Sequence, residues 1–155
     1  MPPHIVHTGT SSSSPAEVWG ALAAFDRIGA WAGGVDHSSS LTASTEGVGA
    51  GRRVQVGRTT LIETVAAWVP ERELAYTIDG LPPLARSVVN RWRLEPASDG
   101  TTVTLTVEVD PGPTPRGRLA ARALGLAMRR PTRRLLDDLL AHVAPMAVPG
   151  AEAAA

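Results

Sequence analysis

The sequence predicts an α+β fold in which a long C-terminal helix covers one face of an antiparallel sheet. Residues 114–143 are the only segment that is long and periodic enough to form a long amphipathic helix. Residues 35–109 are instead typical of consecutive strands separated by turns, which indicates an antiparallel meander. Within residues 101–111, Val and Leu alternate with Thr and Glu, so one face of this sheet is apolar and the other polar. We therefore expect the helix to lie on the apolar face.

The other elements are predicted in chain order. Residues 4–10 are short and include β-branched side chains, which favours a first strand. Ser14, with Pro15 and Glu17 after it, has the pattern of a capping box with a proline start, which predicts a short helix. A second short helix is expected to end at Gly33-Gly34. About seven strands are expected in all; those after the first lie within residues 36–44, 52–60, 61–69, 73–83, 86–96 and 101–111.

One side of the C-terminal helix carries arginines. At 100° per residue, a stripe roughly 60° wide contains Arg118, Arg122, Arg129 and Arg133. The stripe has three possible roles: a solvated helix face, a contact surface for anionic lipid headgroups, or a contact with nucleic acid. The last is disfavoured because acidic and basic residues balance at 15 each, so no nucleic-acid partner is expected.

The opposite side of this helix is expected to be buried and consists mostly of small residues. Small residues in this position indicate either close packing on the sheet or a cavity between helix and sheet. Pro131 lacks an amide proton and is expected to kink or restart the helix. The predicted buried side consists of Ala120, Ala123, Leu124, Ala127, Met128 and Leu135.

Length and composition exclude several classes of protein. A chain of 155 residues predicts one domain, placed at residues 1–146, with a flexible Ala-rich tail at residues 147–155. Since Cys and Lys are both missing, thiolate metal sites, disulfides and Schiff-base chemistry are excluded. The histidines lack ligand spacing with carboxylates, and the glycine-rich stretch precedes a strand, so neither a metal nor a cofactor is expected. With no signal peptide or membrane-spanning run visible, a cytoplasmic protein is expected.

Four segments resemble a known superfamily: SPAEVWGALAAFDRIGAW, EGVGAGRRV, ETVAAWVPERELAYTI and RWRLEPASDGTTVTLTVEV. In this order they resemble the START-like, polyketide cyclase/dehydrase and lipid-transport superfamily (SRPBCC), which has the Bet v 1-like helix-grip fold. The resemblance spans about residues 6–143. It implies a sheet wrapped round the long helix with a largely apolar cavity between them. Proteins with similar sequences include lipid carriers, hormone receptors and aromatase/cyclases, so the resemblance by itself leaves the activity open.

Strand alternation predicts which side chains face this cavity. If charged side chains face outward, the alternate side chains of the same strand face inward, and this predicts one inward-facing set of residues on each of four strands. On the second strand, His37 shares a face with Val35 and Leu41, so it is the one histidine expected to reach the cavity. The inward sets are Val54 and Val56; Ile62, Thr64, Ala66 and Trp68; Leu74, Tyr76 and Ile78; and Val88, Asn90, Trp92 and Leu94.

These faces predict a binding site for a hydrophobic small molecule. Its predicted residues are His37, Val54, Val56, Ile62, Thr64, Trp68, Tyr76, Asn90, Trp92, Leu105, Leu124, Ala127 and Met128. We expect a carrier or sensor of a lipid or polyketide-like ligand. One alternative is a polyketide cyclase/dehydratase that uses pocket shape together with His37 and Tyr76 as acid/base groups. Another is a regulatory or interaction protein whose cavity is filled by its own side chains.

Overall fold

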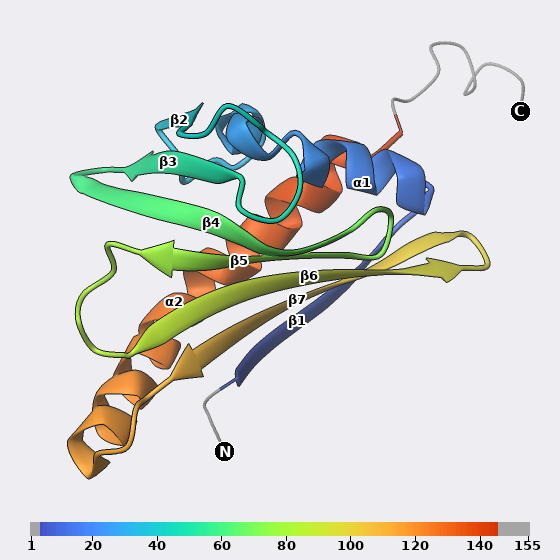
Figure 1. Cartoon of the computed structure of the whole chain (residues 1–155). Coiled ribbons are helices and arrows are strands. Elements are labelled where there is room, and N and C mark those ends of the chain that lie inside the picture. Colours follow the sequence, from blue (N-terminus) through green and yellow to red (C-terminus); the bar gives the residue numbers. More distant parts are fainter. Residues whose placement is uncertain (1–3, 146–155) are drawn as a thin grey trace, which may run out of the picture.

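The computed structural model describes residues 4–145, and the predicted tail at 147–155 lies outside these residues. Within them, seven antiparallel strands form one sheet in the order β1-β7-β6-β5-β4-β3-β2. Two short helices follow β1, and one long helix ends the described chain, so the predicted helix-grip α+β fold is confirmed (Figure 1). The elements are β1 (His4–Ser11), α1 (Pro15–Ala23), η1 (Phe25–Ala30), β2 (His37–Ser40), β3 (Gly51–Val56), β4 (Thr59–Val69), β5 (Glu73–Asp79), β6 (Ser87–Ala97), β7 (Gly100–Asp110) and α2 (Pro115–Val143).

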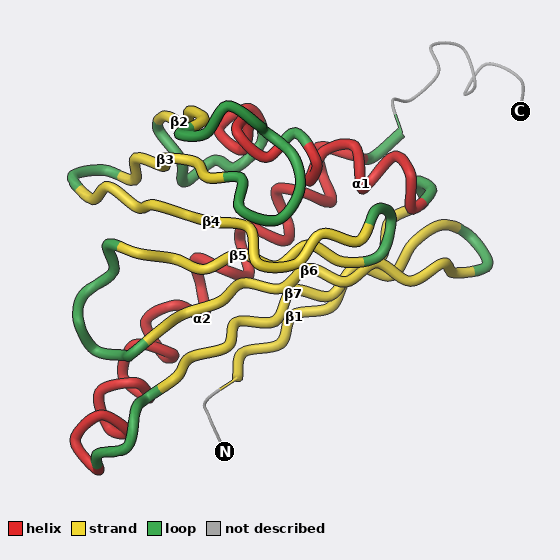
Figure 2. Tube along the Cα trace, in the orientation of Figure 1, coloured by secondary structure: helices red, strands yellow, loops and turns green. Residues whose placement is uncertain are grey.

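Three helical segments share the inner face of the sheet. The long helix α2 crosses it obliquely and packs mainly on β1 and β7, while η1 packs on β2 and β3 (Figures 1 and 2). Between them, α1 packs on β6 and β7 and touches the C-terminal part of α2. The centre of the inner face therefore lies beneath the two short helices as well as beneath α2. The main core contains Val18, Leu22 and Phe25 from these helices, Leu74, Tyr76, Trp92, Val103, Leu105 and Val107 from the sheet, and Leu124, Leu136 and Leu139 from α2.

The first short helix begins as the sequence predicts. The Ser14 hydroxyl accepts from the amide of Glu17, and the Glu17 carboxylate accepts from the amide of Ser14, which completes the capping box. The second short helix differs from the prediction, because η1 ends at Ala30, before Gly33-Gly34. The Ser38 hydroxyl holds η1 on β2, accepting from the amide of Gly29 and donating to a backbone carbonyl.

The long helix is continuous through Pro131, so a restart of the helix there was a wrong prediction. Thr132 directly follows the proline and donates its hydroxyl hydrogen bond to the carbonyl of Met128 at 2.7 Å. The predicted buried side was also rotated, because Ala123 and Ala127 are exposed while Ala121 and Gly125 are buried. Leucines occur on both sides of this helix, so periodicity alone does not fix which side is buried. The buried residues of α2 are Ala121, Leu124, Gly125, Thr132, Leu136 and Leu139.

Strand β4 faces opposite to the prediction over most of its length. Val65 pairs with Tyr76 on β5, and Glu63 pairs with Ile78, so these side chains point to the inner face of the sheet. Ile62, Thr64 and Ala66 therefore point outward, and their predicted inward orientation was wrong. A β-bulge between Val65 and Ala67 then reverses the alternation, which returns Trp68 to the inner face opposite Leu74.

His37 lies on the outer face of the sheet, so its predicted inward orientation was also wrong. It pairs with Gln55 on β3, whose side chain is on the outer face, and its own side chain is exposed. The neighbouring Ser38 instead pairs with the buried Val54. A strand of four residues without apolar alternation takes its register from its partner, so sequence spacing could not place His37. The histidine that reaches the inner face is His7 on β1, whose Nε2 lies 2.9 Å from Oγ1 of Thr132.

Candidate ligand site

The short helices and the centre of the sheet border a narrow inner space. This space is too narrow to admit a water molecule in the described conformation. Its walls are mostly apolar and aromatic, but they include one charged side chain, Arg52 on β3. The lining residues are Ala21, Leu22, Ala24, Ile28, Trp31, Arg52, Leu74, Tyr76 and Trp92.

Arg52 forms a buried ion pair with Glu63. Nε of Arg52 lies 2.5 Å from Oε2 of Glu63, and the two side chains are only 3% and 7% exposed. Since the two residues are directly opposite each other on β3 and β4, the sheet register itself brings the charges together. Nη1 of Arg52 also donates to the carbonyl of Phe25 at 2.7 Å. The guanidinium lies 3.9 Å from the ring centre of Phe25 and 4.7 Å from that of Tyr76, which adds cation–π attraction.

Tyr76 joins this ion pair to a second polar group. Its hydroxyl accepts hydrogen bonds from Nδ2 of Asn90 and Nε1 of Trp92, each at 3.4 Å. Burial raises the pKa of Tyr76 above its ordinary value, and the negative charge of Glu63 raises it further. The phenol is therefore a neutral group that keeps its own proton.

Three buried polar atoms in this region have no hydrogen-bond partner among the described residues. They are Nε1 of Trp31, Nη2 of Arg52 and Oδ1 of Asn90. Buried polar groups in proteins are nearly always paired, so unpaired ones need a specific explanation. Two of the three, the N–H groups of Trp31 and Arg52, belong to residues that line the inner space. A bound molecule with a hydrogen-bond acceptor could satisfy them.

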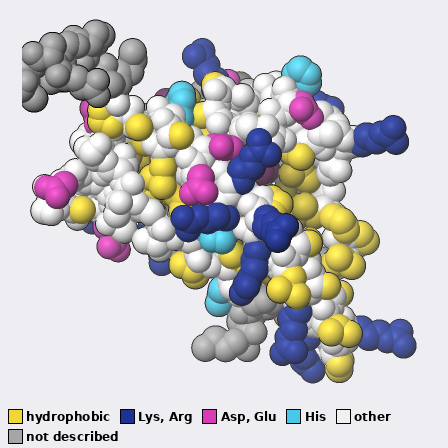
Figure 3. Space-filling view, turned by 180° about the vertical axis from the view of Figure 1, so that it is seen from behind, with side chains coloured by type: hydrophobic (Ala, Val, Ile, Leu, Met, Phe, Trp, Pro, Cys, Tyr) yellow, Lys and Arg dark blue, Asp and Glu magenta, His cyan; other side chains and the backbone are white. Residues whose placement is uncertain are grey.

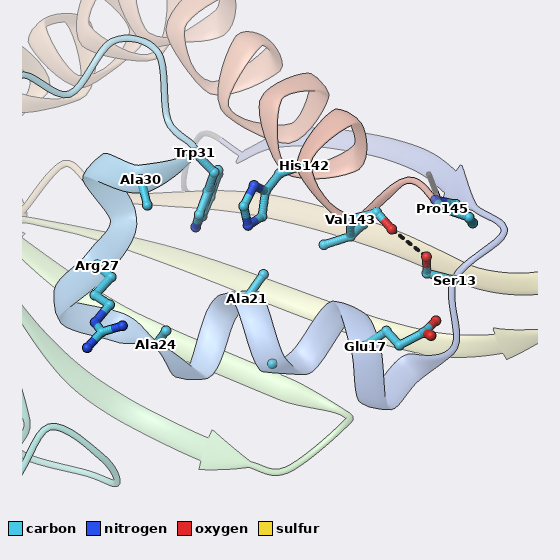
Figure 4. A pocket seen from close by; sticks show the side chains of 11 residues that line it. Ser13, Glu17, Ala21, Ala24, Arg27, Ala30, Trp31, His142, Val143 and Pro145 are labelled. Atoms are coloured by element: carbon cyan, nitrogen blue, oxygen red, sulfur yellow. Dashed lines mark hydrogen bonds between the residues drawn. The ribbon is translucent and has the colours of Figure 1, made fainter. Parts of the chain in front are cut away.

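A larger pocket of about 520 Å³ opens beside this inner space, between α1, η1 and the last turn of α2 (Figure 4). Ser13 closes one end of it by donating to the carbonyl of Val143. Trp31 and His142 project into it, and Glu17 and Arg27 add charges at its edge (Figure 4). The outer pocket is lined by Ser13, Glu17, Gly20, Ala21, Ala24, Arg27, Ala30, Trp31, His142, Val143 and Pro145.

Trp31 forms the partition between the two spaces. It lines both of them, together with Ala21 and Ala24. Its indole packs edge-to-face on Trp92, with ring centres 6.2 Å apart. The other two shared residues are alanines, so Trp31 is the only large side chain that lines both spaces.

The structure divides the predicted site residues into separate groups. Tyr76 and Trp92 line the inner space, and Asn90 contacts Tyr76 behind it. Trp68 packs edge-to-face on Trp19, with ring centres 5.1 Å apart. The other predicted residues do not line the inner space. Leu105, Leu124 and Met128 belong to the main core, and Val54 packs with Ile28 and Ala32. The remaining predicted residues lie at the sheet edge, on its outer face or on the surface: Val56, Ile62, Thr64, His37 and Ala127.

Sequence reasoning missed Arg52, Glu63 and Trp31. A signal for Arg52 was present, because it precedes the inward-facing Val54 by two residues and therefore shares its face. The rule that charges face outward concealed Glu63, since the rule does not hold when an opposite charge lies across the ladder. Trp31 lies after a short helix and carries no periodic signal.

The sequence of residues 2–144 matches the family described as polyketide cyclase / dehydrase and lipid transport. The chain belongs to this family. No match is found among curated proteins. Membership of the family implies binding of a hydrophobic small molecule. Among residues 4–145, no group of three or more His, Asp or Glu could hold a metal ion, and no helix is long and apolar enough to cross a membrane.

Solved structures of similar fold cover nearly the whole chain of this family member. The Zhui aromatase/cyclase from Streptomyces sp. R1128 is 20% identical, with a TM-score of 0.74 over 92% of this chain and 94% of that chain. Ara h 8.0201 is 15% identical, with a TM-score of 0.72 over 92% and 98%. A protein from Thermobifida fusca is 22% identical, with a TM-score of 0.71 over 90% and 92%. Similarity at these identities shows the shared fold.

Proposed function

We propose that this family member binds an uncharged, largely apolar small molecule, lipid or polyketide-like, beneath its short helices and α2. The observation that carries the proposal is the pair of unpaired N–H groups, from Arg52 and Trp31, on residues that line an otherwise apolar inner space. Two unpaired donors on residues that line one small space favour a ligand that presents an acceptor there. The aromatic walls provided by Tyr76 and Trp92 favour a flat or slender ligand.

The ion pair supports an uncharged ligand. The charge of Arg52 is already balanced by Glu63. A carboxylate brought beside them would leave the interior with a net negative charge, and a buried charge without compensation is costly. A carbonyl or hydroxyl oxygen accepts from the free N–H of Arg52 without adding charge. The site therefore favours a neutral polar end over a fatty-acid carboxylate.

The outer pocket supports a route into this site. The inner space is too narrow for water in the described conformation, so a ligand must displace a side chain to enter. Trp31 is the side chain common to both spaces that is large enough to act as a barrier. We expect the ligand to occupy the outer pocket first and to move Trp31 away from Trp92.

Calorimetric titration with a matched pair of probes, 2-naphthol and 2-naphthoate, tests this proposal. The two share one ring system and differ in carrying a neutral hydroxyl or a carboxylate. We expect 2-naphthol to bind more tightly by about tenfold or more. Tighter binding of 2-naphthoate would contradict the neutral-ligand proposal. If neither these probes nor the pair dodecanol and dodecanoate bind, the alternative of a protein with a filled cavity is the better one.

Two variants locate the binding of the probe. Gly20 lines the outer pocket and a Cβ atom there would meet nothing within 4 Å, so Gly20→Leu adds bulk at the wall of this pocket. We expect Gly20→Leu to weaken 2-naphthol binding and Gly20→Ala, its matched control, to leave it nearly unchanged. Equal affinity in the two variants would exclude the outer pocket as the route. In Glu63→Gln protein, Arg52 is no longer balanced, so the preference should shift toward 2-naphthoate.

A polyketide cyclase/dehydratase is the second candidate function. It is favoured by the buried, neutral Tyr76 beside Arg52, which together could donate a proton and polarise a carbonyl group. One protein of similar fold is described as an aromatase/cyclase. If the chain is a cyclase, Tyr76→Phe should slow ring formation from a carrier-bound poly-β-ketone by about 10²–10⁴-fold. His37→Ala should have no effect because His37 is exposed. A product mixture that is unchanged by adding the wild-type protein would rule out this function.

A further inference from the structure

The long helix α2 has a second apolar face, opposite the one that packs on the sheet. Leu119 and Leu126 are 70% and 68% exposed, and the side chain of Ala123 between them is also exposed. At 100° per residue these three lie within a stripe roughly 60° wide, on the far side of the helix from the buried Ala121. Two leucines with most of their surface in water on one face of a helix indicate a contact surface. We call this stripe, Leu119, Ala123 and Leu126, the outer leucine face.

Arginines surround the outer leucine face. Residues 116–134 contain seven arginines and no acidic residue. Among the described residues, only two of the seven form ion pairs, Arg133 with Asp137 and Arg134 with Asp138. The space-filling view from behind shows hydrophobic and basic side chains close together over the part of the molecule where the first half of α2 lies (Figure 3). The face therefore combines apolar area with uncompensated positive charge.

The position of each arginine decides which of them belong to this surface. Arg122 and Arg129 lie on one flank of the outer leucine face, and Arg116 lies on the other. Arg118 does not belong to it, because it lines a separate pocket with Glu108 and Asp110. The four arginines of the stripe predicted from the sequence are exposed on α2, and two of them, Arg122 and Arg129, flank the outer leucine face.

Charge complementarity selects one partner for this face. A second copy packed through the same face would bring its arginines against these arginines, with no acid in the stretch to offset them. Nucleic acid would pair with the arginines but would leave the leucines exposed to water. An anionic lipid surface can contact both the leucines and the arginines. The leucines enter the boundary between headgroups and acyl chains, while the guanidinium groups bind phosphates.

We propose that the first half of α2 lies on an anionic membrane surface through the outer leucine face and its flanking arginines. This inference does not depend on the ligand site, which lies beneath the short helices and involves none of these side chains. Peripheral binding of this kind is reversible, since two leucines and a few arginines give a small buried area. The helix would lie in the plane of the surface, with its buried side still on the sheet.

Flotation of the full-length chain with vesicles tests the proposal. We expect binding to vesicles of phosphatidylcholine with phosphatidylglycerol, little binding to phosphatidylcholine alone, and loss of binding as salt is raised. The double variant Leu119→Ser with Leu126→Ser should weaken binding by about tenfold or more. Arg122→Gln with Arg129→Gln should weaken it about thirtyfold. Val6→Ser is the matched control, since Val6 is 59% exposed but lies on β1, on the opposite face of the sheet from α2.

Other outcomes would overturn the proposal. Equal binding to neutral and anionic vesicles, or binding that survives the double leucine substitution, would contradict it. A dimer in light scattering that the double leucine variant converts to a monomer would assign the face to a second copy of the chain. Thermal melts of each variant check that the chain is folded. The leucine variants should bind 2-naphthol as the wild type does, which separates a failure here from a failure of the proposed function.

Discussion

Arg52 Nε lies 2.5 Å from Glu63 Oε2, and this pair joins β3 to β4 on the inner face of the sheet. Among the described residues, these two are the only charged side chains that are buried. Arg52 also lines the aromatic inner space. Its neutrality as a pair has consequences both for folding and for what can bind beside it.

We predict that Glu63→Gln is strongly destabilising. It removes the counter-charge of Arg52 but leaves the guanidinium buried, at a cost of about 3–5 kcal/mol in the free energy of unfolding. Urea denaturation at neutral pH measures the change. The double variant Arg52→Met with Glu63→Leu is the control, since it removes both charges and should cost far less than the single variant. A single variant that loses less than about 1 kcal/mol would show that the charge is not effectively buried.

Tyr76→Phe should destabilise the chain without creating a large cavity. The hydroxyl that is lost accepts from Asn90 and Trp92, so both donors would be left buried and unpaired. We expect a loss of about 1–3 kcal/mol in the free energy of unfolding. Thr77→Val is the control, because it removes a hydroxyl from the adjacent, half-buried position and should cost about 0.5 kcal/mol or less. Equal effects in the two variants would contradict the role assigned to Tyr76.

Two glycines of α2 should respond to alanine in opposite directions. A Cβ atom at the buried Gly125 would meet nothing within 4 Å, whereas one at Gly117 would lie 2.3 Å from the carbonyl oxygen of Pro111. Gly125→Ala should therefore stabilise the chain by about 0.5–1 kcal/mol through helix propensity alone. Gly117→Ala should destabilise it, since the clash is with backbone atoms. Thermal melts of both variants measure these changes in stability. A loss of stability in Gly125→Ala would mean that the space beside Gly125 is filled.

His7 should make stability depend on pH. Burial lowers the pKa of His7 below its ordinary value of 6.5, and the positive charge of Arg133 lowers it further. A hydrogen bond with the backbone of Arg129 and the negative charge of Asp137 raise the pKa of His7, while the positive charge of Arg129 lowers it. The folded state thus favours neutral His7. As the pH falls through 6.5, the unfolded chain takes up a proton first, so the free energy of unfolding decreases until the folded-state pKa is passed.

Comparison with His7→Gln isolates this effect from other titrating groups. The glutamine amide can still donate to Thr132 but does not titrate. The stability of wild type relative to His7→Gln should be greatest above about pH 7 and should decline below pH 6.5. Urea denaturation at several pH values measures the difference. A difference that is constant with pH, or that grows in acid, would contradict the lowered pKa.

The order of elements could be read from the sequence because it depends on local signals. The capping box at Ser14 and the alternation in β7 each act within a few residues, and both appear in the structure as predicted. The inward orientation of Val103 and Leu105 also follows, since one apolar and one polar face leave a single way to bury the strand. These local signals, with the family resemblance, were enough to predict the helix-grip fold.

The candidate site was decided by tertiary structure, because it depends on pairing between distant residues. A bulge after Val65 changes which face of β4 is buried, and a bulge has no reliable sequence signal. The register of β2 against β3 moves His37 to the outer face. Glu63 faces inward through the register of β4, and Arg52 lies opposite to it, so a carboxylate that sequence rules place in water is buried in an ion pair. The sequence alone determined which elements form, whereas the packing of those elements determined which polar groups meet inside them.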